Sequence, residues 1–185
     1  MIAPGPTLET ERLILRPTAA EDLDGWAELM ADAEAARFIG GVQTRAESWR
    51  AMASMAGSWA LNGFGMFSLI EKDTGRWVGR VGPWRPEGWP GTEVGWSLHP
   101  GAHGKGYAVE AAAAAFHWAH HMLGRTETLH MIDPGNEPSA RVARALGAEP
   151  GEMWTPFWPD AKPVQKWKTT WEAFTATPVY ARLTA

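Results

Sequence analysis

Apolar residues recur at helical spacing in two stretches near the start of the chain. The first stretch predicts a helix over about 19–32, because four residues share one face: Leu23, Trp26, Ala27 and Met30. The second predicts a helix over 44–61 on the same ground, from Trp49, Met52, Ala56 and Trp59. A short apolar strand at 13–16 precedes the first helix, and Thr18 with Glu21 has the spacing of a capping box.

Segments with shorter periods predict strands in the rest of the chain. Residues 65–84 contain two β-rich runs around Asp73-Thr74-Gly75, which indicates a hairpin. Further elements then alternate: strands at 92–100 and 126–134, and helices at about 106–122 and 136–147. Around 163–174, Trp167, Thr169 and Trp171 alternate with polar residues, as in a half-buried last strand. We expect one α+β domain over 1–185, with a central mixed, mostly antiparallel sheet and helices on both faces.

Composition argues against two classes of function, nucleic-acid binding and membrane association. With 185 residues and a formal net charge of −4, the chain lacks the basic excess of a nucleic-acid-binding protein. No segment approaches the length of a membrane span and there is no cysteine, so we expect a cytoplasmic protein without membrane association. The 12 tryptophans fit a large core, and some of them fit the wall of an apolar groove.

A glycine-rich turn opens one of the predicted helices, in the segment HPGAHGKGYAVEA at 99–111. Either the turn needs positive φ angles, or its backbone amides bind an anion at the helix N-terminus. A phosphate loop of the Walker A type is excluded because Gly106, not Ser or Thr, follows Lys105. A dinucleotide fingerprint is excluded because Val109 stands where its third glycine would be.

Three segments together resemble the GNAT acetyltransferase superfamily, in its branch similar to ribosomal-protein N-terminal acetyltransferases. They are LETERLILRPTAAEDL, EVGWSLHPGAHGKGYAVEA and NEPSARVARALGA, in this order over most of 8–150. The resemblance implies that acetyl-CoA is the co-substrate and that no metal is needed. It also implies a splayed pair of parallel strands, with the CoA pyrophosphate held by the amides around six residues: His103, Gly104, Lys105, Gly106, Tyr107 and Ala108. On this interpretation Gly106→Val abolishes CoA binding while barely affecting the fold.

The resemblance also implies roles on the strand at 92–100. A strand amide near Leu98 would stabilise the oxyanion, and Glu93 would act as the base, usually through water. Glu93 shares a face with Gly95 and Ser97, and an exposed glutamate or an ion-pair partner is the alternative interpretation. His99 is a second candidate base, or an ordinary loop histidine.

Many family members have a tyrosine that acts as the general acid at the position of Ala143, and this chain lacks that tyrosine. Ser139 is then the best hydroxyl to protonate the departing sulfur, unless it only bonds its own backbone. Asn136 would cap this helix and contact the pantetheine amide. His117 and His121 share a helical face, but no further ligand completes a zinc site, so none is expected.

The predicted activity is transfer of acetyl from acetyl-CoA to a primary amine, of a protein N-terminus or of a small molecule. The alternative is a regulatory module that binds acetyl-CoA with little or no catalysis, for which Ala143 is the main argument. A homodimer formed through the last strands is a further expectation. The sequence names no acceptor.

Overall fold

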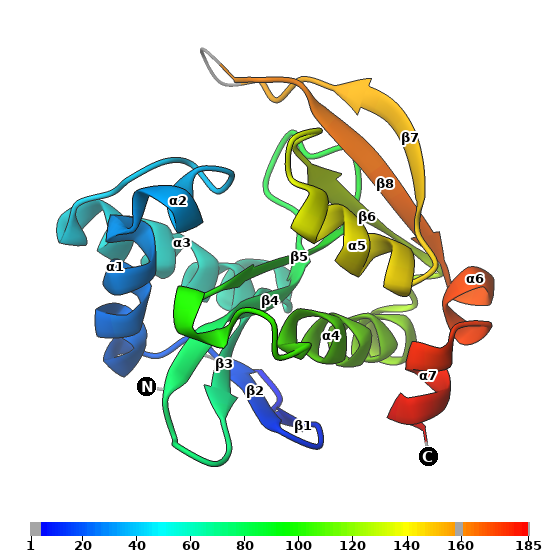
Figure 1. The fold of residues 1–185 in the computed structure, drawn as a ribbon, viewed down its shortest axis with the longest axis horizontal. Coiled ribbons are helices and arrows are strands. Elements are labelled where there is room, and N and C mark those ends of the chain that lie inside the picture. The colour runs from blue at the N-terminus through cyan, green and yellow to red at the C-terminus, as the bar shows by residue number, and fades with distance from the viewer. Residues whose placement is uncertain (1–4, 158–160, 185) are drawn as a thin grey trace.

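A computed structural model describes residues 5–157 and 161–184. Its elements follow the predicted order, with several short additions (Figure 1). The strands are β1 (Leu8–Glu9), β2 (Leu13–Pro17), β3 (Phe67–Glu71), β4 (Trp77–Trp84), β5 (Glu93–Leu98), β6 (Glu127–Ile132), β7 (Glu149–Trp154) and β8 (Val164–Thr170). The helices are η1 (Ala20–Asp22), α1 (Leu23–Ala31), α2 (Ala33–Ala36), α3 (Arg45–Asn62), η2 (Pro100–Ala102), α4 (Tyr107–Leu123), α5 (Glu137–Ala145), α6 (Trp171–Thr175) and α7 (Pro178–Leu183).

The eight strands form one mixed sheet in the order β1-β2-β3-β4-β5-β6-β8-β7. All neighbours are antiparallel except β5 and β6, which are parallel and pair only at Glu93 and Leu129. Beyond this pair the two strands separate. The expected α+β fold and the splayed parallel pair are therefore confirmed, and the gap between β5 and β6 opens the middle of the sheet.

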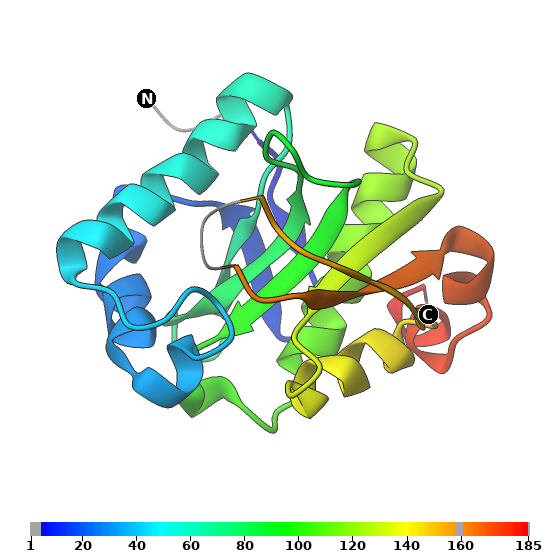
Figure 2. The same cartoon turned by 90° about the horizontal axis from the view of Figure 1, so that it is seen from above.

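Helices cover both faces of the β2–β5 half of the sheet (Figures 1 and 2). On one face α4 packs closely, because its run of small residues, Ala111–Ala115, is buried against Leu69, Val81 and Val94. On the other face α1 and α3 form a second cluster that includes Trp26 and Met52. No helix in the described ranges is long and apolar enough to cross a membrane.

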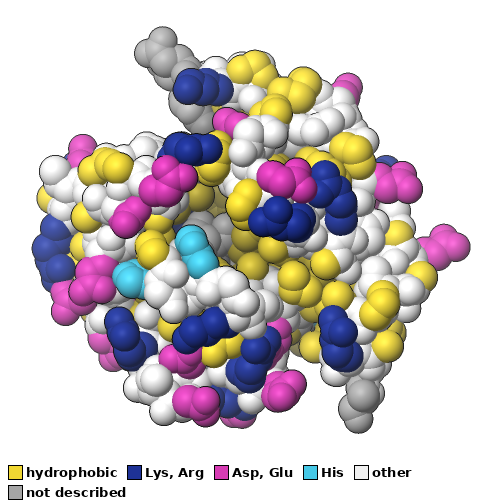
Figure 3. Space-filling view, viewed as in Figure 1, with side chains coloured by type: hydrophobic (Ala, Val, Ile, Leu, Met, Phe, Trp, Pro, Cys, Tyr) yellow, Lys and Arg dark blue, Asp and Glu magenta, His cyan; other side chains and the backbone are white. Residues whose placement is uncertain are grey.

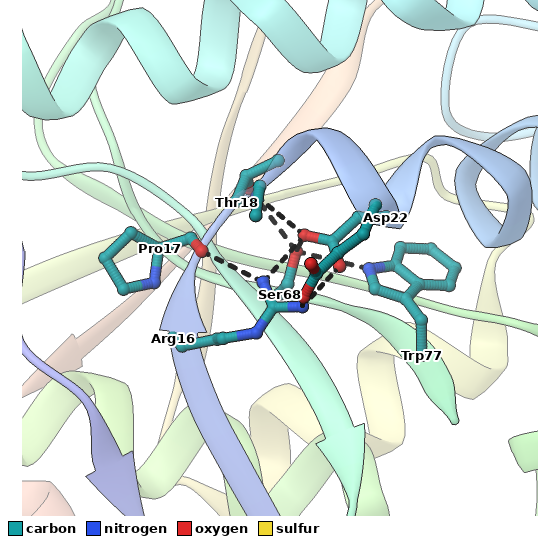
Figure 4. Close-up of polar contacts among 8 residues, drawn as sticks. Arg16, Pro17, Thr18, Asp22, Ser68 and Trp77 are labelled. Carbon is teal, nitrogen blue, oxygen red and sulfur yellow. Dashed lines mark hydrogen bonds and ion pairs between the residues drawn. The ribbon is translucent and has the colours of Figure 1, made fainter. Parts of the chain in front are cut away.

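The start of the first helix differs from the expectation. Thr18 does not cap it; a short 3₁₀ turn comes first, and the Asp22 carboxylate accepts the Ala19 amide at 2.8 Å. Asp22 is also bound by both terminal nitrogens of Arg16 and by the hydroxyl of Ser68 at 2.6 Å (Figure 4). A buried carboxylate therefore joins the start of α1 to β2 and β3. Its partners supply the hydrogen bonds that a buried charged group requires.

The C-terminal part of the sheet also differs. The predicted last strand exists as β8, but Trp171 starts helix α6, and β8 is not at the edge because β7 covers it. Strand β7 was not predicted, because its six residues are almost all exposed and carry no apolar alternation. Backbone pairing with β8 forms this strand. A dimer through the last strands remains a prediction, and on this sheet it would have to use β7.

The tryptophans divide between core and surface. Trp26, Trp59 and Trp167 are buried, as expected for large aromatic side chains. Trp49 is not on the buried face of α3 as predicted, since 54% of it is exposed.

Candidate active site

Two adjoining cavities follow β5, and they hold most of the predicted site residues. The large cavity, about 800 Å³, lies between the glycine turn, β5 and α5. The small cavity, about 300 Å³, lies on the α1–α3 side of β4 and β5. Six residues line both: Phe38, Ile39, Trp96, Ser97, Asn136 and Ser139. Figure 3 shows the opening as a hollow lined by hydrophobic side chains between the α1–α3 side and the α5 side.

The glycine turn has both predicted properties, positive φ angles and backbone amides that are open to a ligand. Gly104 and Gly106 have φ angles of 74° and 80°, in the left-handed region that favours glycine. Gly106 is also the N-cap of α4 and provides no side-chain cap. In the described chain, no amide from 104 to 109 donates a hydrogen bond to another protein group. The turn therefore presents a row of open donors to the large cavity, whose wall includes Gly104, Gly106 and Ala108.

The expected neutrality of Gly106→Val for the fold is wrong. At φ 80° a β-branched residue is strained whatever space surrounds it, so this substitution would disturb the turn itself.

The side chain of Lys105 contacts Glu71 and does not line the large cavity. The Lys105 ammonium therefore anchors the turn and adds no charge to the wall of the large cavity. Thr74, Lys105 and Tyr107 all donate to the Glu71 carboxylate, and these hydrogen bonds lower the pKa of Glu71 to about 2. Glu71 stays ionised and ties the turn to the end of β3.

A second anchor comes from the N-terminus. The guanidinium of Arg12 donates to the carbonyl of Lys105 at 2.7 Å and forms an ion pair with Glu110, in the first turn of α4. The sequence gives no local signal for these anchors, because the partners are more than 30 residues apart in the chain.

The open edge of β5 carries Leu98. His99 donates its amide to Val78 on β4, so the alternation of an antiparallel ladder directs the amides of Trp96 and Leu98 toward the gap. Side chains already satisfy two carbonyls on this edge: His130 Nδ1 binds Val94 at 2.8 Å, and His103 Nε2 binds Leu98 at 3.0 Å. His103 therefore closes the strand end while the Leu98 amide faces the gap.

Glu93 lies in the wall of the small cavity, half-buried, at the point where β5 and β6 separate. Burial raises the pKa of Glu93 to about 7, although two donors and the charge of Arg80 act against this shift. The donors are the amide of Met131 at 3.4 Å and the indole of Trp89 at 2.9 Å. Glu93 is therefore not an exposed glutamate and forms no ion pair with a described residue, and its pKa lets it exchange a proton near neutral pH.

Ser139 and Asn136 meet the strand gap from the start of α5. Asn136 Oδ1 accepts the Ser139 amide at 3.2 Å, which confirms the predicted cap. The Ser139 hydroxyl does not bond its own backbone; its oxygen accepts the indole N–H of Trp96 at 3.3 Å. Its own proton has no acceptor among the described residues and can be donated to a group in the cavity. Ala143 is fully buried, and Trp96 packs against the cluster around it.

The other histidines do not join the site. His99 binds the Gly101 amide and lies 3.6 Å from Glu28, outside the residues that line either cavity. His117 and His121, in the C-terminal half of α4, pack against Trp171. Across the described residues, no three His, Cys, Asp or Glu side chains gather as a metal site would require.

Two arginines in the cavity walls were missed. Arg141 is exposed on α5 and lines the large cavity. Arg80 is buried on β4 and lines the small one. The signal for Arg80 was available, because a charged residue stands inside the apolar run WVGRVGPW.

Comparison with known proteins decides the family. The model of the acetyltransferase (GNAT) domain matches residues 12–149. The chain belongs to the GNAT acetyltransferase family. A similar protein is p20, an uncharacterised N-acetyltransferase of Bacillus licheniformis, 29% identical over 143 residues, which are 76% of this chain and 80% of p20. The resemblance noted in the sequence is confirmed.

Solved structures agree. An acetyltransferase of Agrobacterium tumefaciens superposes with a TM-score of 0.80 at 30% identity, over 90% of this chain and 95% of the other. The ribosomal-protein-S5-alanine acetyltransferase of Vibrio fischeri has the same fold, with a TM-score of 0.72 at 19% identity, over 92% of this chain and 99% of the other. This GNAT protein is therefore an acetyltransferase with the acyl-CoA N-acyltransferase fold.

Proposed function

We propose that this GNAT acetyltransferase transfers the acetyl group of acetyl-CoA to a primary amine by direct attack on the thioester. The single observation that carries the proposal is the continuity of the two cavities along β5. Open backbone amides stand at one end, and a carboxyl group whose pKa lies near 7 stands at the other. The wall that the cavities share contains a free hydroxyl proton, on Ser139.

The large cavity suits the donor. The amides of residues 104–109, at the positive end of the α4 dipole, would hold the pyrophosphate, and Arg141 would add charge from α5. The open edge of β5 would pair with the pantetheine arm as an added strand does, and Asn136 lies beside it. The amide of Leu98 faces this gap and would donate to the oxyanion.

The small cavity suits the acceptor. Glu93 would take a proton from the ammonium form of the amine, directly or through water, and so release the lone pair that attacks the acetyl carbon. A C–N bond forms as the C–S bond breaks. Ser139 would donate its proton to the leaving sulfur and regain one from the attacking nitrogen, which sheds its second proton directly or through water, while the Trp96 indole keeps the hydroxyl oxygen in place.

The test separates binding from turnover. Calorimetric titration should show binding of acetyl-CoA and of desulfo-CoA, and much weaker binding of ATP. With any accepted amine, Glu93→Gln and Ser139→Ala should each lower kcat/KM by about 100-fold, without changing the affinity for acetyl-CoA. Turnover at wild-type rates in both variants would contradict the assigned roles, and absence of acetyl-CoA binding would contradict the donor site.

One observation favours a binding module without catalysis. Ala143, where many family members have a tyrosine that acts as the general acid, is fully buried and offers no proton. Binding of acetyl-CoA with no turnover of any amine would decide for this alternative.

A further inference from the structure

Arg80 is a buried cation with no ion-pair partner among the described residues. Only 6% of it is exposed. Its Nη1 donates to the thioether of Met55 at 3.2 Å, and its guanidinium lies over the ring of Trp26 at 4.3 Å. Its Nε has no hydrogen-bond partner among the described residues, and no carboxylate of these residues lies within ion-pair distance of the side chain.

Such an arrangement is unfavourable in the absence of a ligand. A guanidinium that leaves water needs several hydrogen-bond acceptors, and a thioether and an aromatic ring replace them poorly. Burial accordingly lowers the pKa of Arg80 to about 10. A bound anion would supply the missing acceptors and offset the loss of hydration.

The side chain has access to such a ligand because it lines the small cavity. Along the floor of this cavity, Arg80 pairs with Ser97 across the β4–β5 ladder, and Glu93 pairs with Trp84. Directly opposed residues share a face of the sheet, so the cation and the candidate base stand on the same face.

The floor between them lacks a side chain of its own, and the Met66 methyl group and the Glu93 carboxylate lie over it. Gly95 separates Ser97 from Glu93 on β5, and a Cβ there would meet the Met66 methyl carbon at 2.8 Å and Glu93 Oε1 at 3.2 Å. The third charged residue in the wall, Asp133, already accepts the amide of Gly135 at 2.8 Å. The same cavity wall thus offers a cation and a candidate base, with the flexible side chain of Met66 beside them.

The rest of the wall is largely apolar and includes Ile39, Met66 and Trp84. The volume of about 300 Å³ suits a molecule of amino-acid size. Among anions, a carboxylate matches the planar fork of one guanidinium and balances its single charge.

We propose that Arg80 binds a carboxylate of the acceptor, and that the acceptor is therefore a small amino acid-type molecule with an apolar side chain. This inference rests on the proposed N-acetyltransferase function and specifies its substrate class. Arg80 binds and positions the substrate and takes no part in proton transfer.

The test compares the common amino acids with their carboxamides as acceptors, in the wild type and in Arg80→Met. The amide keeps the amine and the side chain, and it also resembles the start of a peptide. We expect the wild type to prefer the acids, and Arg80→Met to lower the ratio of kcat/KM for acid over amide by about 100-fold. The ratio within each protein cancels differences in amine reactivity between variants.

Two controls accompany this comparison. Arg50→Met, on an exposed part of α3 that lines neither cavity, should leave the ratio unchanged. If Arg80→Met does not fold, inhibition of the wild type by 3-phenylpropionate and by 3-phenylpropanamide replaces it, and only the acid should compete with the acceptor.

The outcomes keep the two proposals apart. Acetylation of amides as well as acids, with equal losses in Arg80→Met, would overturn the carboxylate site and leave the acetyltransferase proposal intact. A wild-type preference for the amides would overturn it too and favour a peptide N-terminus. If no amine of any class is acetylated, the proposed function itself fails.

Discussion

At the scale of single residues, the environment of Glu93 determines its chemistry. The separation of β5 and β6 leaves the amide of Met131 without a strand partner, and the Glu93 carboxylate accepts it. The same position removes the carboxylate from water, and this loss of hydration outweighs the hydrogen bonds and raises the pKa of Glu93 to about 7. A property useful for a base is thereby unfavourable for folding at high pH.

The free energy of unfolding should therefore depend on pH through Glu93. The folded state holds a proton on Glu93 that the unfolded chain releases, so stability should fall as pH rises from about 4.5 to about 7. Glu93→Gln removes the titrating group. We expect the variant to unfold at a higher temperature than the wild type at pH 8, with the two midpoints converging near pH 4.5.

Thermal unfolding followed by circular dichroism at both pH values measures this effect. Glu87→Gln, at an exposed position in the loop before β5, is the matched control and should show no such gain. A wild type more stable than Glu93→Gln at pH 8 would show that the carboxylate is stabilised in the fold.

At the scale of elements, polar contacts between distant segments hold the site in place. Glu71 and Arg12 tie the glycine turn to the β1–β3 side, and the Asp22 cluster ties α1 to the same strands. The first arrangement fixes the large cavity. The second fixes the helix that packs over Arg80 through Trp26.

Asp22 and Asp24 allow a comparison of a buried and an exposed ion pair two residues apart. Asp22, with 1% of its side chain exposed, pairs with Arg16, whereas Asp24, with 80% exposed, pairs with Arg45. We expect Asp22→Asn to lower the free energy of unfolding by about 3 kcal/mol, because Arg16 and Ser68 lose the charge that they surround. Asp24→Asn should cost about 0.5 kcal/mol or less.

Urea unfolding of both variants measures the difference. Equal losses would mean that the Asp22 cluster contributes no more than a surface ion pair. Since only Asp22 connects three elements, a larger loss should also weaken acceptor turnover through displacement of α1.

At the scale of the whole molecule, local patterns in the sequence predicted the elements but not the contacts between them. The helical period placed α4 at 106–122 against an observed Tyr107–Leu123, and alternation placed Glu93 on the strand beside the site. Strand β7 escaped because its pairing with β8, and not its side chains, forms it. The positive φ angle of Gly106 was likewise not predicted for this residue, because it depends on how the turn joins the start of α4.

Among the site residues, those with local contacts could be predicted and those with long-range contacts could not. Asn136 and Ser139 could be predicted because capping is local, while the contact of Lys105 with Glu71 joins residues 34 positions apart. Arg80 stood out in its strand, but only the structure shows that Trp26 and Met55, and no carboxylate of the described residues, contact its guanidinium. Long-range contacts therefore decide which charges are available to a ligand.

Binding of acetyl-CoA should act on the stability of the entire fold, since the large cavity is built from the turn, β5 and α5 together. At a free concentration 100 times Kd, a ligand that binds only the folded state raises the free energy of unfolding by about 2.7 kcal/mol.

Arg141→Ala should weaken acetyl-CoA binding about tenfold, most clearly at low salt, because this exposed cation would face the phosphates. Calorimetry and thermal unfolding at two salt concentrations measure both effects. Glu93→Gln, altered only in the small cavity, should keep the full stabilisation. If Arg141→Ala bound acetyl-CoA as the wild type does, the pyrophosphate would be held by the backbone amides of the turn alone.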